Sequence, residues 1–387
     1  MQSPLIWAEV DLSAIAHNVR ELRRLTRPHA RVMAVVKANG YGHGAVEVAR
    51  TALSNGAEWL GVARLAEGIQ LRKNGFDAPI LVFGHTLPAD AGLLVDFDLR
   101  QSVTSLDAAG AYSAGACARG RRIKAHLKLD TGMGRLGLVP AALSGSSSPD
   151  AAGAALIREA TAIAKLPGID AEGVFTHFAA ADSAALSSAK RQLEIFRDVL
   201  ERLRSAGLEF PIRHTANSAA LIALPDAHLD LVRPGIAVYG LNPSDEIDLQ
   251  GVDLRPAMAL KARIIHVKRV PPGFSVSYGM THRTPKPTTI ATVPAGYADG
   301  LNRSLSNRGQ MLVHGQRVPI VGRVCMDLTM LDVGTTPDVQ VGDEAVIFGS
   351  QGHAGIPADE LARALGTINY EIVCAVSGRV PRIYLRS

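Results

Sequence analysis

The sequence predicts an α/β protein made of a (β/α)8 TIM barrel followed by a mainly β C-terminal domain. Between residues 31 and 240, short apolar runs rich in β-branched residues alternate with longer segments of helical periodicity, which is typical of βα units around a parallel sheet. There are eight such runs, the number that closes a barrel of this kind. Beyond residue 243, strand-like runs follow one another closely with Gly, Pro, Asn and Asp between them, a pattern that indicates hairpins.

The barrel strands are predicted from apolar runs that lead into polar or glycine-containing segments. The eight predicted strands span residues 31–37, 59–63, 79–84, 100–104, 123–129, 171–177, 211–217 and 230–235. We assign residues 11–243 to the barrel domain and residues 244–387 to the C-terminal domain. A strand at residues 4–10 precedes the barrel but is expected to join the C-terminal domain. The length of 387 residues suits one barrel-sized domain plus a smaller one.

Helices are expected at residues 44–56, 187–207 and 357–366. Ser187 and Ser188 are candidate N-caps of the second of these helices, and Gly207 is the expected residue beyond its end. The segment 144–155 is low in complexity and small in side chain, so we predict that it is an exposed loop insertion.

The composition argues against several classes of function. With 41 Lys and Arg against 36 Asp and Glu, the net charge is +5, and no dense basic block indicates a nucleic-acid or membrane-surface patch. No apolar run approaches the roughly 18 residues of a membrane span. Cys117, Cys325 and Cys374 form no C-x-x-C pair, which argues against a disulfide framework and structural zinc. His43 and His214 are interpreted as ordinary polar residues, so no metal is expected. The first residues do not resemble a secretory signal, and a cytoplasmic protein is expected.

Polar side chains gather at the expected C-terminal ends of the barrel strands, where barrel enzymes place their active sites. They are Lys37 at the first strand, Lys128 and Arg135 at the fifth, His177 at the sixth, Ser218 at the seventh, and Arg233 with Gly235 at the eighth. Lys37 ends a buried strand, and partial desolvation favours the neutral amine that forms a Schiff base. Backbone donors at Ser218, Gly235 and Ile236 could receive a phosphate, because the loops after strands seven and eight are the usual phosphate site. A Schiff-base lysine facing a phosphate site points to pyridoxal 5′-phosphate.

Nine stretches of the chain carry a resemblance to a known family. In order, they are "AVVKANGYGHG", "LKLDTGMGRLG", "FTHFA", "ANSAA", "VRPGIAVYG", "VSYGM", "PAGYADG", "VGRVCMD" and "INYEI". With these stretches the sequence resembles the alanine racemases over nearly its whole length. The resemblance implies an isomerase that interconverts L-alanine and D-alanine with pyridoxal 5′-phosphate and supplies D-alanine for the peptidoglycan of the cell wall. It also implies a homodimer in which the β domain of one subunit closes the barrel site of the other.

The resemblance also implies roles in cofactor binding and proton transfer. Lys37 matches the lysine that binds the cofactor and acts as a base on one face of the substrate, and Tyr278 of the partner subunit matches the base on the opposite face. Arg233 matches the partner of the pyridine nitrogen, Arg135 matches the arginine that holds the phenolic oxygen and approaches the substrate, and His177 is expected beside the cofactor. The residues that match phosphate ligands are Tyr41, Ser218, Gly235, Ile236 and Tyr370.

Further residues are expected around the substrate. Met326 resembles the residue whose backbone N–H receives the substrate carboxylate, and Asp327 follows it at the expected substrate entrance. Asp299, beside Tyr297, is expected to belong to the same entrance. Lys128 matches a lysine that many family members carry in carbamylated form, and a neutral amine beside a cation would favour that reaction.

Physical reasoning supports the same assignment. Racemisation removes a proton from Cα on one face and delivers one on the other, so it needs two groups on opposite sides of a planar intermediate. The phenol of Tyr278 needs cationic neighbours to act as a base, and His177 and Arg233 are candidates to relay that influence. An arginine does not give its proton to the pyridine ring, so the ring stays a weaker electron sink. We hypothesise that this restrains side reactions such as transamination.

Three other functions stay open at this point. A decarboxylase of basic amino acids uses a similar barrel and the same cofactor, but its family places a carboxylate where this chain has Arg233. A non-catalytic protein that binds pyridoxal phosphate would need the barrel alone, and the β domain with Tyr278 and Met326 argues against it. A racemase of broader specificity for small amino acids, such as serine, would share all the residues named above.

Overall fold

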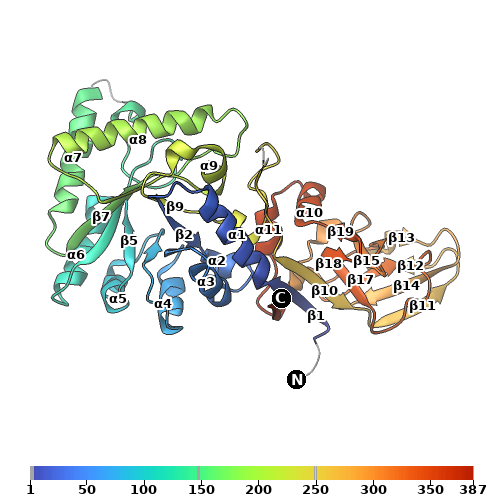
Figure 1. Ribbon diagram of the computed structural model, residues 1–387. Helices are drawn as coiled ribbons and strands as arrows, with labels where there is room; N and C mark the ends of the chain where they lie inside the picture. Colours follow the sequence, from blue (N-terminus) through green and yellow to red (C-terminus); the bar gives the residue numbers. More distant parts are fainter. Residues whose placement is uncertain (1–3, 146–148, 248, 250, 387) are drawn as a thin grey trace. The chain divides into compact units, whose positions relative to one another are not determined.

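The computed structural model describes residues 4–145, 149–247, 249 and 251–386, which belong to two compact units (Figure 1). The barrel unit comprises residues 14–40 and 45–255. The C-terminal unit comprises the chain up to Ser13, the short segment Tyr41–Gly44, and the chain from Pro256 onward.

The described part of the barrel unit contains one sheet of eight parallel strands. They are β2 (Arg31–Val35), β3 (Trp59–Val62), β4 (Ile80–Val82), β5 (Arg100–Val103), β6 (Ile123–Lys128), β7 (Ile169–Phe175), β8 (Ile212–His214) and β9 (Leu231–Val232). Their order is β8-β7-β6-β5-β4-β3-β2-β9, and each overlaps one of the predicted strands. The barrel is nearly closed, because β8 and β9 share no ladder. At this seam, the backbone N–H of Asp230 donates to Arg213 at 3.0 Å and that of Arg233 donates to Ala216 at 2.9 Å. The predicted barrel is therefore confirmed.

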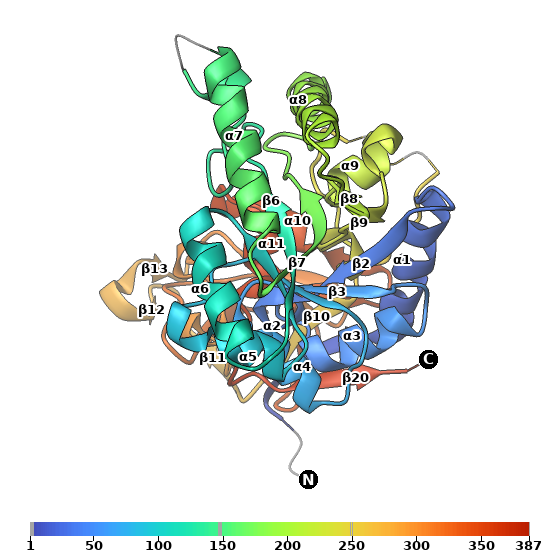
Figure 2. The same ribbon diagram turned by 90° about the vertical axis from the view of Figure 1, so that its left-hand side faces the viewer.

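Helices surround the strands of the barrel unit (Figure 2). They are α1 (Leu12–Leu25), α2 (Lys37–Tyr41), α3 (Ala45–Leu53), α4 (Leu65–Lys73), α5 (Ala91–Asp96), α6 (Leu106–Cys117), α7 (Pro149–Ala164), α8 (Ser187–Ser205) and α9 (Ser218–Ala223). Short 3-10 helices are η1 (Pro88–Asp90), η2 (Ala141–Leu143), η3 (Pro225–Ala227) and η4 (Ile236–Tyr239). The predicted helix at 44–56 is confirmed by α3.

Two local predictions about helices are wrong. The predicted loop at 144–155 contains the start of α7, because its alanines are strong helix formers and Pro149 suits a first helical turn; residues 146–148 lie outside the described residues. Helix α8 has no serine N-cap: Leu186 occupies that position with a φ of 51° and no side-chain capping bond. Its other end agrees with the prediction, because Gly207 follows the helix with a φ of 77°.

The barrel interior combines apolar and polar layers. Met33, Trp59, Leu81, Ile212 and Leu231 form one buried cluster, against which Phe83 packs. Buried polar side chains also come from β5, β6 and β8 and from Arg233, which directly follows β9. Gly61 of β3 leaves room for Phe83 and Met33, since a Cβ there would lie 2.7 Å from the Phe83 ring and 2.9 Å from the Met33 sulfur.

The described part of the C-terminal unit is mainly β, as predicted. Its main sheet has the order β16-β15-β18-β10-β1-β20, with β19 paired to β18; β11, β14 and β17 form a second sheet, and β12 and β13 a third. The bounds are β1 (Ile6–Asp11), β10 (Met258–Arg263), β11 (His266–Val270), β12 (Ser275–Val276), β13 (His282–Arg283), β14 (Thr288–Val293), β15 (Gln310–Val313), β16 (Gln316–Pro319), β17 (Thr329–Asp332), β18 (Glu344–Gln351), β19 (Ala354–Ile356) and β20 (Arg382–Leu385). Strand β1 pairs with β10 and β20.

The C-terminal unit also contains helices α10 (Ala358–Leu365) and α11 (Asn369–Cys374) and the 3-10 turns η5 (Tyr278–Met280), η6 (Tyr297–Asp299) and η7 (Arg303–Leu305). Helix α10 confirms the predicted late helix, whereas α11 was not predicted. None of the helices in the described residues has both the length and the apolar character that crossing a membrane requires.

Candidate functional site

Lys37 opens a left-handed turn that follows β2. The strand ends at Val35, two residues earlier than predicted, and Ala38, Asn39 and Gly40 have φ values of 53°, 53° and 61°. A left-handed conformation costs about 1–2 kcal/mol for a residue with a Cβ, and less for Asn. The Glu67 carboxylate stabilises the turn by accepting the N–H of Ala38 at 2.6 Å. The turn leaves the half-buried Lys37 at the end of β2, on the C-terminal side of the barrel.

The loop after β6 is folded around one carboxylate. Oδ1 of Asp130 accepts the backbone N–H groups of Gly132, Met133 and Gly134 at 3.1, 2.8 and 2.9 Å. Its Oδ2 accepts that of Arg135 at 2.8 Å. Burial alone would raise the pKa of Asp130, but these four donors outweigh it and lower the pKa below its usual value. The aspartate therefore fixes the backbone that carries Arg135.

Arg233 lies inside the barrel and is held by β8 and the end of β7. Its side chain is buried, and its Nη2 donates to the backbone oxygens of Thr176 at 2.8 Å and Thr215 at 3.0 Å. Its Nη1 contacts Nδ1 of His214 at 2.9 Å. His214 is thus part of the site, contrary to the interpretation of it as an ordinary polar residue. Burial lowers the pKa of Arg233 to about 9, which leaves it charged at neutral pH.

The cations of the predicted rim lie close enough to influence one another. The pKa of Lys128 is lowered to about 7, mainly by burial and in addition by the positive charges of Arg233, Arg135 and Lys37, while Asp130 opposes them. Burial also holds the pKa of His177 well below its usual range, with Arg233, Lys128, Arg135 and Lys37 acting in the same direction. The structure therefore gathers these strand-end residues around one strongly cationic space, which suits an anionic ligand.

The two turns of the predicted phosphate site adjoin each other. Oγ of Ser218 accepts the backbone N–H of Gly235 at 2.8 Å and that of Ala237 at 3.4 Å. Ser218 and Ile236 are both buried. Asn217, predicted as the end of a strand, instead caps α9 by accepting the N–H of Ala220. A hydroxyl and backbone N–H groups thus converge next to the seam between β8 and β9.

Six predicted residues belong to the C-terminal unit, and one of them, Asp299, is a partner of Arg379. The rings of Tyr41 and Tyr370 lie 6.1 Å apart, and burial raises the pKa of Tyr41. The turn that carries Tyr278 contacts the segment before Met326, because Oγ of Ser277 donates to the Arg323 carbonyl at 2.6 Å. The side chains of Tyr278 and Met326 are 73% and 53% exposed. The sixth residue, Asp327, follows Met326 and is exposed.

Arg379 is a residue that the sequence reasoning missed. Its Nε donates to Oδ1 of Asp299 at 2.7 Å, and its Nη2 donates to Oδ1 of Asp327 at 2.7 Å. Asp299 is buried and also accepts the N–H of Gly296 at 2.9 Å. Arg379 therefore ties the turn of Tyr297 to the segment of Met326, and the hydrogen bonds to the two aspartates raise its pKa. These contacts span 80 and 52 residues, so no local pattern could reveal them.

Sequence reasoning missed two other residues, and only one of them had a local signal. Asp130 precedes Thr-Gly-Met-Gly, a context in which aspartate commonly accepts backbone donors. Glu67 of α4 supports the Lys37 turn from another βα unit and had no local signal. Within the described residues, no group of three or more His, Cys, Asp or Glu side chains is placed to hold a metal ion.

Comparisons with known proteins agree over the whole chain. The family models described as "Alanine racemase, N-terminal domain" and "Alanine racemase, C-terminal domain" match residues 10–243 and 257–384. The alanine racemase of Desulfosudis oleivorans is 57% identical over 378 residues, which cover 98% of this chain and 96% of that protein. The alanine racemase of Desulforamulus reducens is 50% identical over 385 residues, which cover 100% of this chain and 100% of that protein.

Solved structures give the same result. The alanine racemase of Clostridium difficile 630 superimposes with a TM-score of 0.92 at 37% identity, covering 100% of this chain and 97% of that one. The enzyme from Streptomyces lavendulae, a producer of D-cycloserine, superimposes with a TM-score of 0.91 at 41% identity and covers 100% and 98%.

Proposed function

The chain belongs to the alanine racemase family, and we propose that it interconverts L-alanine and D-alanine with pyridoxal 5′-phosphate by a two-base mechanism. One observation carries the proposal most directly. Lys37, the buried Arg233 and the turn at Ser218 and Gly235 all lie at the C-terminal ends of the barrel strands, where barrel enzymes act.

The residues present fit this cofactor. It carries an aldehyde, a phosphate and a phenolic oxygen, and the site offers an amine, a hydroxyl with backbone donors, and a surplus of cations. Lys37 would hold the aldehyde carbon, Arg135 the phenolic oxygen and Arg233 the ring nitrogen, with His177 alongside. The phosphate ligands would be Tyr41, Ser218, Gly235, Ile236 and Tyr370. When bound, the cofactor supplies an electron-withdrawing ring that makes the Cα–H bond of the substrate acidic.

Two groups of the protein would move the proton. Nζ of Lys37 takes or gives it on one face of Cα, and the phenol oxygen of Tyr278 of the partner subunit acts on the other face. The N–H of Met326, with Asp327 and Arg135, would orient the substrate carboxylate. The contact between the Ser277 turn and the segment before Met326 supports a joint role, since it fixes the two groups relative to each other.

Arg233 would restrict the chemistry to racemisation. Its guanidinium is charged at neutral pH and donates a hydrogen bond without transferring a proton. A ring nitrogen that stays unprotonated withdraws fewer electrons, so fewer side reactions compete. Arg233→Glu should therefore gain transaminase activity, measured as pyruvate released from alanine; a variant that gains none would count against this role.

Lys128 is a candidate for carbamylation by carbon dioxide. Its pKa of about 7 leaves much of the amine neutral at physiological pH, which the reaction requires. The negative charge so formed would face Arg135 and orient it. Electron density at Nζ in crystals grown with bicarbonate tests the modification, and density for an unmodified amine would refute it.

A homodimer with shared active sites would explain the exposed side chains of the C-terminal unit. Tyr278, Met280, Met326 and Leu328 are large, apolar and between 39% and 73% exposed. Burial of such side chains against a second subunit is favourable. We further propose a cytoplasmic role in supplying D-alanine for peptidoglycan.

The deciding experiment follows the interconversion of L-alanine and D-alanine by the wild type, Lys37→Ala and Tyr278→Phe. L-serine, L-lysine and L-arginine are assayed alongside, and carbon dioxide release is monitored. The proposal requires that the wild type racemises alanine best and that both variants lose this activity. Release of carbon dioxide would favour a decarboxylase, equal turnover of serine a broader racemase, and cofactor binding without turnover a non-catalytic protein.

A further inference from the structure

A chain of hydrogen bonds leads from Arg233 through the barrel interior to a carboxylate. Nη1 of Arg233 contacts Nδ1 of His214 at 2.9 Å, and Nε2 of His214 contacts Nδ1 of His126 at 2.8 Å. Nε2 of His126 contacts Oε2 of Glu172 at 3.0 Å. Both histidines are fully buried. We call Arg233, His214, His126 and Glu172 the interior chain.

The two ends of the interior chain fix the position of every proton in it. A guanidinium only donates, so Nδ1 of His214 is an acceptor and its Nε2 carries the hydrogen. That hydrogen is donated to Nδ1 of His126, so the Nε2 of His126 carries a hydrogen as well. The carboxylate of Glu172 accepts it. Both imidazoles are therefore neutral Nε2–H tautomers, and burial lowers the pKa of each, which favours the same state.

Arg233 has an unusual charge environment. A buried cation is costly unless a counter-ion accompanies it. Among the described residues, no carboxylate forms an ion pair with Arg233; its direct partners are His214, His177 and two backbone oxygens. The interior chain links it instead to the negative charge of Glu172, two imidazole rings away.

The backbone is adapted to this arrangement. The pairing of β6 with β7 shifts register between Ala125 and His126, so that Ala125 faces Ala171 while His126 faces Gly173, and Glu172 is the extra residue of a β-bulge. Adjacent residues of a regular strand point to opposite faces, whereas a bulge can turn both inward. A Cβ at Gly173 would lie 2.5 Å from Nδ1 of His126, so only glycine leaves room for that ring.

Two aromatic rings hold the histidines in place. Phe175 stacks on His214 with ring centroids 4.7 Å apart and an interplanar angle of 4°. Trp59 meets His126 edge to face at 5.6 Å. Neither ring can turn without losing both this packing and its two hydrogen bonds.

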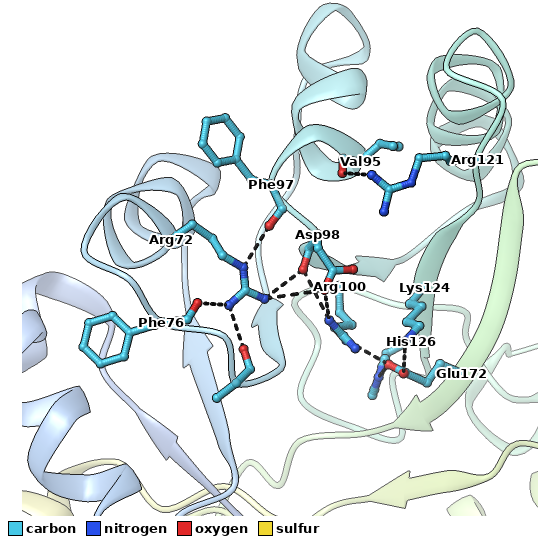
Figure 3. Close-up of polar contacts among 11 residues, drawn as sticks. Arg72, Phe76, Val95, Phe97, Asp98, Arg100, Arg121, Lys124, His126 and Glu172 are labelled. Carbon is cyan, nitrogen blue, oxygen red and sulfur yellow. Dashed lines mark hydrogen bonds and ion pairs between the residues drawn. The ribbon is translucent and has the colours of Figure 1, made fainter.

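Glu172 also has partners outside the interior chain (Figure 3). Arg100 lies 3.4 Å and Lys124 3.8 Å from its carboxylate. Arg100 in turn pairs with Asp98 at 3.1 Å, and Arg72 lies 3.9 Å from Asp98. A purely structural Glu172 would serve only to neutralise Arg100 and Lys124, so the test has to separate this role from an effect on Arg233.

We propose that Glu172 and His126 are positioning residues that act through His214 to hold the guanidinium of Arg233 against the ring nitrogen of the cofactor. This inference rests on the proposed function. The geometry ties the reaction specificity of the site to a carboxylate that touches neither substrate nor cofactor.

The first test uses the wild-type holoenzyme and does not depend on activity. In a protein labelled with 15N at its histidine rings, His126 and His214 must show one protonated and one unprotonated nitrogen each, with the hydrogen on Nε2. A doubly protonated ring at either position, or an Nδ1–H tautomer, overturns the interior chain. Assignment uses the spectra of His126→Gln and His228→Gln, the second being a buried histidine outside the chain.

The second test compares holoenzymes of Glu172→Met, which removes the acceptor, and Glu172→Gln, which keeps an acceptor oxygen. Asp98→Asn is the matched control, because it removes a carboxylate paired with Arg100 from outside the chain. Loss of a hydrogen bond to a charged group predicts that kcat for alanine falls at least about tenfold in Glu172→Met. The KM for alanine should change far less, since Glu172 does not contact the substrate.

Two signatures distinguish positioning from mere stability. The absorbance maximum of the bound cofactor should shift in Glu172→Met, and pyruvate should form faster relative to racemisation, with the amino group left on the cofactor and water supplying the ketone oxygen. Glu172→Gln should recover most of the wild-type behaviour, and Asp98→Asn all of it. A Glu172→Met enzyme with wild-type spectrum and product ratio overturns the proposal, as does an Asp98→Asn enzyme that changes equally. Failure of the wild type itself to racemise alanine would refute the proposed function. The histidine tautomers measured in the first test would still show whether the hydrogen bonds of the interior chain exist.

Discussion

Replacement of Asp130 by asparagine should weaken the cofactor site by a predictable amount. The carboxylate accepts four backbone donors at 2.8 to 3.1 Å. Asparagine keeps one acceptor oxygen for the three donors on Oδ1, but places an NH2 group against the N–H of Arg135. The variant thus loses one hydrogen bond to a charged group and the charge behind the others, a cost of about 2–3 kcal/mol. If that cost falls on the loop of Arg135, the dissociation constant of the cofactor rises roughly 30-fold or more.

The assay titrates the apo-protein with pyridoxal 5′-phosphate and follows absorbance, alongside thermal unfolding. Asp107→Asn, an exposed residue of α6, is the control and should change stability by no more than about 0.5 kcal/mol. The folded-state pKa of Asp130 is lowered, so its contribution is complete above the unfolded-state pKa and is lost as the pH falls through the folded-state pKa. The difference between wild type and Asp130→Asn should therefore shrink below about pH 4. Wild-type affinity and unfolding temperature in Asp130→Asn would refute the reasoning.

Three further predictions follow from other parts of the structure. The folded-state pKa of Lys128 is lowered to about 7 from 10.5, so the unfolded chain binds more protons than the folded chain between these pH values. In carbon dioxide-free buffer, the free energy of unfolding should therefore rise with pH across this window. Denaturation at several pH values should show a weaker rise in Lys128→Met. Ala38→Gly should be neutral or stabilising by up to about 1 kcal/mol, because glycine adopts the left-handed conformation of this position without strain. The control Ala155→Gly, at an exposed position of α7, should destabilise the protein by about 1 kcal/mol. Equal decreases of the unfolding temperature in the two variants would contradict this reasoning. Arg379→Met should raise the KM for alanine more than it lowers kcat, because it releases Asp327 and the segment of Met326, and Arg379→Lys should restore part of the loss; unchanged kinetics would argue against this link.

The barrel could be predicted because its signal is local and repeated. Most of the strands are short apolar runs with at least one β-branched residue, and they end at polar or glycine-containing segments. The same repetition placed Lys37 and Arg233 at one rim, because parallel strands bring their C-terminal ends together. Helix α7 was missed since alanine-rich, low-complexity sequence resembles a loop by composition while favouring a helix by propensity.

The supporting residues could not be predicted for a different reason. The left-handed turn after Lys37 is a matter of backbone φ values, and the spacing of apolar residues in the sequence does not indicate these values. The pairing of His126 with Glu172 depends on a bulge that shifts the register of β7 by one residue, and such a shift reverses which side chains face inward. The sequence shows Gly173 and both partners, but only the fold shows that the glycine makes space for the ring.

The seam between β8 and β9 links the binding of the proposed cofactor to the stability of the barrel. Seven junctions of the barrel are ladders, whereas this one is held by two backbone hydrogen bonds and by side-chain contacts, including those of Arg213 with Asp230 and of Arg233 with Thr215. Ser218 follows one side of the seam and Gly235 the other, so a single phosphate bound to both would bridge the one junction of the sheet without a ladder among the described strands. A ligand that binds the folded barrel and not the unfolded chain stabilises the folded state by thermodynamic linkage. Tighter binding of the proposed cofactor would therefore raise the free energy of unfolding of the barrel.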